Sequence, residues 1–301
     1  MVTRVTHGTI QRSTLANLQT NLTAVARLQA QMSSGTRISV PSDDPAGAHD
    51  LLRLRADQRT AVQHRRNADD GDAWLTTVDT ALQASLGILR RSRDLAVRAG
   101  AQGSLGPDSR EALAAEVEAR RDELLQQANT TYSGRHVFAG TSATAAFTVD
   151  TSAPPARTYA WSGTPSATVT REVGPDASVR VDADGAAVFG VGDASVFAAL
   201  DRLAADIRAG ADVSSSIDAI DARMSSMLSE VAAVGARHNQ VLSAQDTLAQ
   251  RDITLKTQVS ALADVDLAGI VLEIQSQEVA YRGALGAASK VLAPSLMDFL
   301  R

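Results

Sequence analysis

The stretch from residue 217 to residue 262 constrains the fold more than any other part of the sequence. Hydrophobic positions recur there in alternating steps of three and four, with no proline and a single glycine, Gly235. Eleven of the fourteen positions are apolar, and the full set is Ile217, Ile220, Met224, Met227, Val231, Val234, His238, Val241, Gln245, Leu248, Asp252, Leu255, Val259 and Leu262. Helices with a 3.5-residue repeat supercoil with a partner that covers the stripe. Because each buried aliphatic side chain stabilises by roughly 1.5–3 kcal/mol, the sequence predicts a long helix paired with another part of the same chain.

Both ends of the chain carry shorter stripes with the same spacing. The N-terminal stripe comprises Leu15, Leu18, Leu22, Val25, Gln29 and Met32, and Gly35 follows as a natural left-handed residue after a helix. After Asp266 as an N-cap, the C-terminal stripe comprises Leu267, Ile270, Ile274, Gln277, Tyr281, Ala284, Ala288 and Val291. The last residues, which include Leu296, Phe299 and Leu300, are again apolar. Contiguous apolar surface of this kind predicts docking onto a neighbouring molecule.

The remaining segments predict three more helices and a small β domain. Asp44 is typical of an N-cap and Pro45 of a first helical position, so a helix is expected over about 45–99. Further helices are expected over about 109–130 and over 196–209. The residues between them are rich in Pro, Gly, β-branched and aromatic side chains, which predicts short strands. The expected strands are a short strand and turn at 137–141, followed by 147–149, 158–161, 167–173, 179–181 and 187–191. The fold class expected is mainly α with an inserted small β domain.

Composition argues against several classes of protein. The net charge is −5, so the basic footprint of a nucleic-acid-binding protein is missing. The chain has no cysteine, which excludes disulfides, thiol nucleophiles and cysteine-ligated metals. No apolar run reaches the length of a membrane span, and the first residues lack the apolar core of a secretory signal peptide. We therefore expect no nucleic-acid partner, no membrane insertion, and no cleaved signal peptide on any route out of the cell.

The sequence offers no recognisable catalytic motif. None of the five histidines pairs with another at metal-ligand spacing, and no phosphate-binding loop or nucleophile elbow occurs. Asp43 and Asp44 are explained by helix capping, although a metal remains an alternative for this carboxylate pair. The arginines between 53 and 66 suit an exposed polar face, with an anion site as the alternative. His238 interrupts the long stripe, where polar residues set register or partner choice. We expect no cofactor, no metal and no enzymatic activity. A catalytic site assembled from residues that are distant in the sequence remains an alternative.

Several short motifs, in the same order along the chain, resemble the bacterial flagellin family. In the first half they are 17–21 (NLQTN), 31–38 (QMSSGTRI), 41–48 (PSDDPAGA), 93–97 (RDLAV) and 133–141 (SGRHVFAGT). In the second half they are 234–239 (VGARHN), 264–266 (DVD), 281–285 (YRGAL) and 295–300 (SLMDFL). The resemblance covers about 1–141 and 196–301 and leaves the middle uncovered. His238 departs from the family, which often has arginine before the asparagine at 239.

Two features resemble the members of this family at the hook–filament junction. Filament-forming members usually carry alanine where this chain has Pro41 to Pro45, and their C-terminal ends have an asparagine-rich approach to two leucines. This chain instead ends in 294–300 (PSLMDFL). The resemblance therefore implies a structural junction protein of the bacterial flagellum, on which the flagellin filament assembles.

The resemblance also implies an organisation and a set of partners. Residues 1–40 and 265–301 would form an inner polymerisation domain, 41–141 and 196–264 a helical middle domain, and 142–195 an outer β domain. The expected partners are other copies of the chain in a ring, a hook-side junction protein, flagellin, a cytosolic export chaperone and the type III export apparatus. The location implied is the extracellular flagellum. The expected assembly interface on the terminal helices comprises Leu15, Leu18, Leu22, Val25, Met32, Leu267, Ile270, Ile274, Tyr281, Leu285, Val291, Leu296, Phe299 and Leu300, and the turn residues are Gly35, Asp44 and Pro45.

Other functions remain compatible with the sequence. A filament flagellin has the same fold and differs from a junction protein in copy number. A secreted adhesin would use the central β domain to bind its target. An enzyme housed in that β domain is the third alternative.

Overall fold

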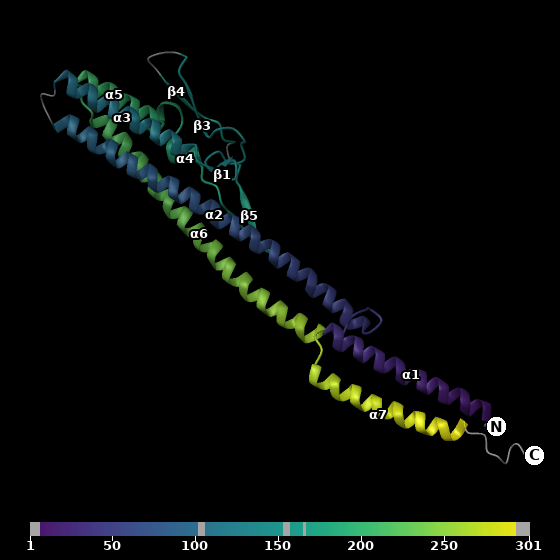
Figure 1. Cartoon of the computed structure of the whole chain (residues 1–301). Coiled ribbons are helices and arrows are strands. Elements are labelled where there is room, and N and C mark those ends of the chain that lie inside the picture. Colours follow the sequence, from purple (N-terminus) through teal and green to yellow (C-terminus); the bar gives the residue numbers. More distant parts are fainter. Residues whose placement is uncertain (1–6, 102–105, 153–156, 165–166, 293–301) are drawn as a thin grey trace, which may run out of the picture. The chain divides into compact units, whose positions relative to one another are not determined.

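The computed structural model describes residues 7–101, 106–152, 157–164 and 167–292 (Figure 1). The chain divides into two compact units. One comprises Met1–Thr60 and Asp252–Arg301, and we call it the terminal unit. The other comprises Ala61–Arg251 and is called the central unit. Two long helices, α2 (Pro45–Ala101) and α6 (Ser214–Ala263), contribute residues to both units.

In the terminal unit, α1 (His7–Ser34) and α7 (Leu267–Leu292) pack against each other (Figure 1). A short backbone joint links the end of α1 to the start of α7. There Thr36 forms an antiparallel bridge with Asp264, and the Val265 amide donates to the Gly35 carbonyl at 3.2 Å. Since α1 runs into this joint and α7 runs out of it, the two helices are antiparallel.

In the central unit, α2 and α6 form an antiparallel pair. Three side-chain contacts fix the direction, because residue numbers on α2 fall as those on α6 rise. The contacts are Arg93 to Asp221 at 2.7 Å, Asp72 to His238 at 2.5 Å and Asp69 to Gln245 at 3.0 Å. Within the central unit, every second position of the α6 stripe is at most 5 % exposed, namely Ile220, Met227, Val234, Val241 and Leu248. The alternating positions are half-buried, as the heptad pattern predicts.

Helices α3 (Pro107–Ala128) and α5 (Val196–Ala209) pack together and share the core of this unit. The Ser195 hydroxyl caps α5 by accepting the Ala198 amide at 3.2 Å. Arg208 of α5 ion-pairs with Glu111 at 2.9 Å and Glu118 at 2.7 Å on α3. These bonds lower the pKa of both glutamates, although the pairs lie at the surface, where such pairs contribute little.

The described residues contain three two-stranded antiparallel sheets, the first just before the inserted β domain and the other two within it. The pairs are β1 (Thr131–Tyr132) with β2 (Arg135–His136), β3 (Phe147–Asp150) with β4 (Thr158–Trp161), and β5 (Thr170–Gly174) with β6 (Ala177–Arg180). Phe147 lies opposite Trp161, and Thr170 lies opposite Arg180. The mainly α fold with a small inserted β domain is thereby confirmed, including the long antiparallel helices.

Two expected strands were wrong, and a third begins later than expected. The run 187–191 is not a strand, since residues Gly185–Phe189 form helix α4 and Gly192–Ala194 form a 3₁₀ turn, η1. The cause is Asp184, whose carboxylate accepts the Ala186 amide at 2.9 Å and starts a helix. Residues 137–139 lie after the short strand β2, and β5 begins at Thr170 rather than at 167.

Five aromatic residues between 138 and 197 form one cluster, namely Phe138, Phe147, Tyr159, Phe189 and Phe197. Phe147 and Phe197 have ring centroids 5.2 Å apart in an edge-on arrangement, and Phe138 and Phe189 show the same spacing. Tyr159 packs on Phe197 and its hydroxyl donates to Asp201 at 2.5 Å, while the buried Arg121 also pairs with Asp201. Burial, followed by the hydrogen bond to Asp201, raises the pKa of Tyr159. The cluster therefore joins β3 and β4 to α5 through both apolar and charged contacts.

Candidate assembly surfaces

Helix α1 has one apolar line that is covered and one that is not. Leu28 is 4 % exposed, and Leu18 and Val25 are half-buried, so these three face the packed side. Leu15 and Leu22, by contrast, are 53 % and 56 % exposed. Because they are seven residues apart, they lie on the same face of the helix. Thus α1 keeps a second apolar line in contact with water.

Helix α7 shows the same two-sided pattern more strongly. Its covered side contains Ile270 and Ala288, which are 6 % and 3 % exposed, with Ile274 and Tyr281 half-buried between them. On another side Leu272 and Val279, again seven residues apart, are 68 % and 70 % exposed. These two are the most exposed of the large apolar side chains in the described part of the chain.

Exposed apolar side chains concentrate on these two helices. Fifteen large apolar side chains are exposed among the described residues, and eight of them lie on α1 and α7. We call these eight the terminal apolar set, and its members are Leu15, Leu22, Met32, Leu267, Val271, Leu272, Val279 and Leu285. Large apolar patches on soluble proteins mark interaction sites. The terminal apolar set is therefore the candidate assembly surface.

The joint between α1 and α7 is rigidly built. Gly35 has φ of 68°, a left-handed conformation that glycine adopts without strain. The Arg37 guanidinium donates to the Leu262 carbonyl at 3.0 Å through Nη2 and at 3.3 Å through Nε, near the end of α6. A cation suits the carbonyl end of a helix, where the dipole is negative.

The turn before α2 is held by two aspartates with different tasks. The Asp43 carboxylate accepts the amides of Val40 and Ser39 at 3.0 and 3.1 Å, and these bonds lower its pKa. The Asp44 carboxylate accepts the Gly47 amide at 2.9 Å and caps α2, with Pro45 as the first helical residue. A side chain at position 47 would come within 2.4 Å of the Asp44 carboxylate, which explains the glycine there. Both carboxylates are thus occupied with backbone amides.

The structure places the expected interface residues in three groups. Leu18, Val25, Ile270, Ile274 and Tyr281 lie between the paired helices, whereas Leu15, Leu22, Met32, Leu267 and Leu285 are exposed. Leu296, Phe299 and Leu300 lie outside the described residues, as does the side chain of Val291.

Sequence reasoning missed three members of the terminal apolar set, namely Val271, Leu272 and Val279, and also the buried Leu28. Leu28 takes the covered position that the strict heptad spacing gave to Gln29, which is exposed. Leu272 and Val279 lie outside the single stripe that the sequence predicts for this helix. Their seven-residue separation was the signal that would have revealed a second stripe.

Among the residues that the structure describes, no group of three or more His, Cys, Asp or Glu side chains is arranged to hold a metal ion. In that same part of the chain, no helix is both long and apolar enough to cross a membrane.

Comparison with known proteins points to the flagellum. Residues 5–143 match the family model of the bacterial flagellin N-terminal helical region. A flagellin of Bacillus subtilis is 27 % identical over 286 residues, which are 92 % of this chain and 92 % of that protein. Flagellins of Vibrio cholerae match 40 % of this chain, and the matched part spans only 32 % of their own length.

Solved structures share the fold. Flagellar hook associated protein-3 of Legionella pneumophila superposes with a TM-score of 0.63 and 16 % identity, covering 70 % of this chain and 98 % of that one. A Vibrio parahaemolyticus structure assigned as a flagellar hook-associated protein superposes with a TM-score of 0.66 and 23 % identity. The match covers 74 % of this chain and 100 % of that one. The resemblance to the bacterial flagellin family is confirmed, and these likenesses support a structural role in the flagellum.

Proposed function

We propose that this flagellin-like chain is a subunit of the junction between the flagellar hook and filament, and that the filament assembles on it. The observation that carries the proposal is the terminal apolar set on two helices that cover each other on one side only. Such a surface suits a subunit that is completed by its neighbours, because assembly removes the apolar area from water. The fold shared with hook associated protein-3 favours the junction among the positions available in a flagellum.

The proposal assigns a task to each part of the chain. Residues 1–40 and 265–301 form the inner polymerisation domain, 41–141 and 196–264 the helical middle domain, and 142–195 the outer β domain. Within the inner domain, the exposed Leu15, Leu22, Leu272 and Val279 contact neighbouring subunits, whereas Ile270 and Ile274 hold α1 and α7 together. Leu296, Phe299 and Leu300, which follow α7 in the sequence, are proposed to belong to the same interface.

The proposed partners follow from this position. Copies of the chain form a ring that contacts a hook-side junction protein on one side and flagellin on the other. Before assembly a cytosolic chaperone covers the apolar C-terminal segment, and the type III export apparatus carries the chain out without cleaving a signal peptide. No catalytic activity and no cofactor form part of the proposal.

Filament flagellin is the second candidate, because the Bacillus subtilis flagellin aligns with nearly the whole chain. The two functions differ in copy number and position, since a filament protein is repeated along the filament and a junction protein occupies one ring.

Deletion of the gene tests the proposal. Cells without the chain should form hooks without filaments and shed flagellin monomers into the medium, and an intact plasmid copy should restore filaments. Filaments on the deletion strain would contradict the junction role. If filaments and secreted flagellin were both absent, immunogold labelling of wild-type filaments would decide. Label confined to the filament base supports the junction, and label along the whole filament supports filament flagellin.

A further inference from the structure

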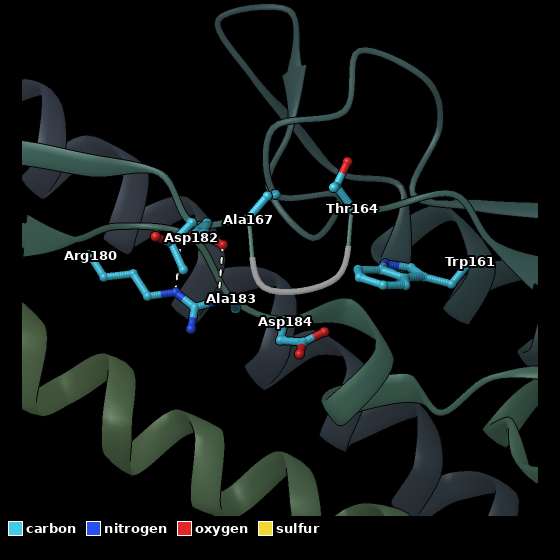
Figure 2. Close-up of a pocket in the computed structure, with 9 residues that line it drawn as sticks. Trp161, Thr164, Ala167, Arg180, Asp182, Ala183 and Asp184 are labelled. Atoms are coloured by element: carbon cyan, nitrogen blue, oxygen red, sulfur yellow. Dashed lines mark hydrogen bonds and ion pairs between the residues drawn. The ribbon is translucent and has the colours of Figure 1, made fainter.

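The central unit contains a small pocket that the assembly surface does not explain (Figure 2). Its volume is about 260 Å³, and its lining includes Trp161, Thr168, Arg180, Asp182 and Asp184. Trp161 lies on one side, while Arg180 and Asp182 lie opposite it, with Asp184 between them at the base in the view of Figure 2. The pocket thus combines one aromatic ring with several polar groups.

The polar wall is held in place by buried hydrogen bonds. Asp182 is 1 % exposed, and its carboxylate accepts the Val169 amide at 2.8 Å and the Arg180 Nε and Nη2 groups at 3.0 Å each. The Asp182 carbonyl accepts Arg237 of α6 at 2.6 Å. A bidentate pair of this geometry fixes the guanidinium plane, so Arg180 is positioned before any ligand arrives.

The aromatic wall is equally fixed. The Trp161 indole N–H donates to the Phe138 carbonyl at 3.0 Å. Its ring packs on Gly163, where a Cβ would come within 2.1 Å of the indole. The half-buried ring is therefore an immobile apolar platform, which binds a flat apolar face without a large loss of side-chain entropy.

Two groups keep unused hydrogen-bonding capacity. Asp184 caps α4 through Oδ1, which accepts the Ala186 amide at 2.9 Å, and none of the hydrogen bonds among the described residues reaches its Oδ2. Arg180 uses Nε and Nη2 on Asp182, and within the described part of the chain no hydrogen bond uses the two N–H donors of its Nη1. The pocket therefore offers a carboxylate acceptor and cationic donors, and Thr168 is among its other lining residues.

We propose that this pocket binds one neutral sugar ring. A pyranose has an apolar C–H face that suits the fixed indole of Trp161, and hydroxyls that donate to Asp184 Oδ2 and accept from Arg180 Nη1. Charge supports this choice, because Arg180 and Asp182 neutralise each other and Asp184 leaves one net negative charge, which disfavours phosphates and carboxylates. This inference concerns the β domain alone and is independent of the junction role.

Fluorescence of Trp161 tests the proposal in the full-length chain. The chain has two tryptophans, and Trp74 is 1 % exposed with an unpaired indole N–H, so Trp74→Phe leaves Trp161 as the sole reporter. Glucose, galactose, mannose and N-acetylglucosamine are titrated separately to roughly 100 mM, because a single small ring is expected to bind in the millimolar range. Isothermal titration calorimetry on the wild-type chain provides the same measurement if Trp74→Phe does not fold.

The decisive variant is Asp184→Asn. Asparagine is as good an N-cap as aspartate, so α4 is retained, but the Oδ2 acceptor becomes an amide donor. Asp176→Asn is the matched control, since Asp176 is exposed in the β5–β6 turn outside the pocket.

Saturable binding of at least one sugar that weakens tenfold or more in Asp184→Asn, and is unchanged in Asp176→Asn, is the expected result. Three results would overturn the proposal. They are binding of none of the four sugars, sugar binding that Asp184→Asn leaves intact, and a response to methylammonium or lysine alone. The last would identify a cation site instead.

Discussion

Replacing Leu272 and Val279 with glutamine should abolish assembly without unfolding the subunit. Both side chains lie on α7 and are 68 % and 70 % exposed, so they contribute little to the packing of the free chain. Glutamine has nearly the same helix propensity as leucine, and surface substitutions of this kind change the free energy of unfolding by about 0.5 kcal/mol or less. The circular dichroism spectrum and the urea midpoint should therefore match those of the wild type.

The effect on assembly follows from the area that neighbours would cover. A fully buried leucine or valine stabilises by about 1.5–3 kcal/mol, and roughly two thirds of that remains to be gained at each position, or about 2–4 kcal/mol for the pair. Since every 1.4 kcal/mol is a factor of ten, each subunit contact should weaken by roughly 30- to 700-fold. Glutamine also places polar groups in the covered surface, which increases the loss.

The assay is complementation of the deletion strain. The double variant should be found in the medium, which shows that export is intact, while cells carry hooks without filaments. The control is Leu228→Gln with Leu242→Gln, two apolar residues of α6 in the central unit that are 47 % and 43 % exposed. Normal filaments with the α7 variant, or equal loss with both pairs, would refute the assignment of α7 as an assembly surface.

Two further predictions concern the fold. Tyr159→Phe should lower the free energy of unfolding by about 1.5–3 kcal/mol at pH 7, because it removes a hydrogen bond to the Asp201 carboxylate. Burial and this bond raise the pKa of Tyr159 above its ordinary 10.0, so its contribution is complete below pH 10 and is lost as pH rises towards the folded-state pKa. Urea titrations between pH 7 and 11 should show that the free energy of unfolding falls less steeply with pH in Tyr159→Phe than in the wild type or in the control Tyr281→Phe. An equally steep fall in Tyr159→Phe would contradict the reasoning. Asp44→Ala should cost about 1 kcal/mol by removing the cap of α2, whereas Asp44→Asn keeps it, and hydrogen exchange of the Gly47 amide distinguishes the two. Equal protection of that amide in both variants would show that the cap is not stabilising.

The long stripe on α6 could be predicted because its period is sustained. From Ile217 to Leu262 all fourteen positions are buried or half-buried, including His238 and Gln245. Over this length, an alternative face of the helix would fail to match the apolar repeat at several positions. The partner helix could not be identified in the same way, since α2 buries two sides. Leu75 and Leu82 lie on one of them and Trp74 and Ile88 on another, so no single stripe stands out.

Short segments were less predictable for the same reason. On α1 only six positions defined the stripe, and the strict spacing selected Gln29 although its neighbour Leu28 is the buried residue. In the β domain, the β-branched and aromatic residues of 187–191 outweighed the capping signal of Asp184, which decides the structure there. The pocket was not foreseeable at all, because its walls come from segments between Gly140 and Asp184 whose approach depends on the hairpins.

The difference between the two units explains why the exposed apolar residues lie where they do. In the central unit, α2 can bury two sides because α6 is joined there by α3, α5 and the aromatic cluster. In the terminal unit, α1 and α7 pack on each other, and a pair of helices can bury only one side of each. A second apolar line on either helix therefore has no partner within the pair. Leu15 and Leu22 on α1, and Leu272 and Val279 on α7, form such lines, which is the pattern expected when the remaining cover comes from another molecule.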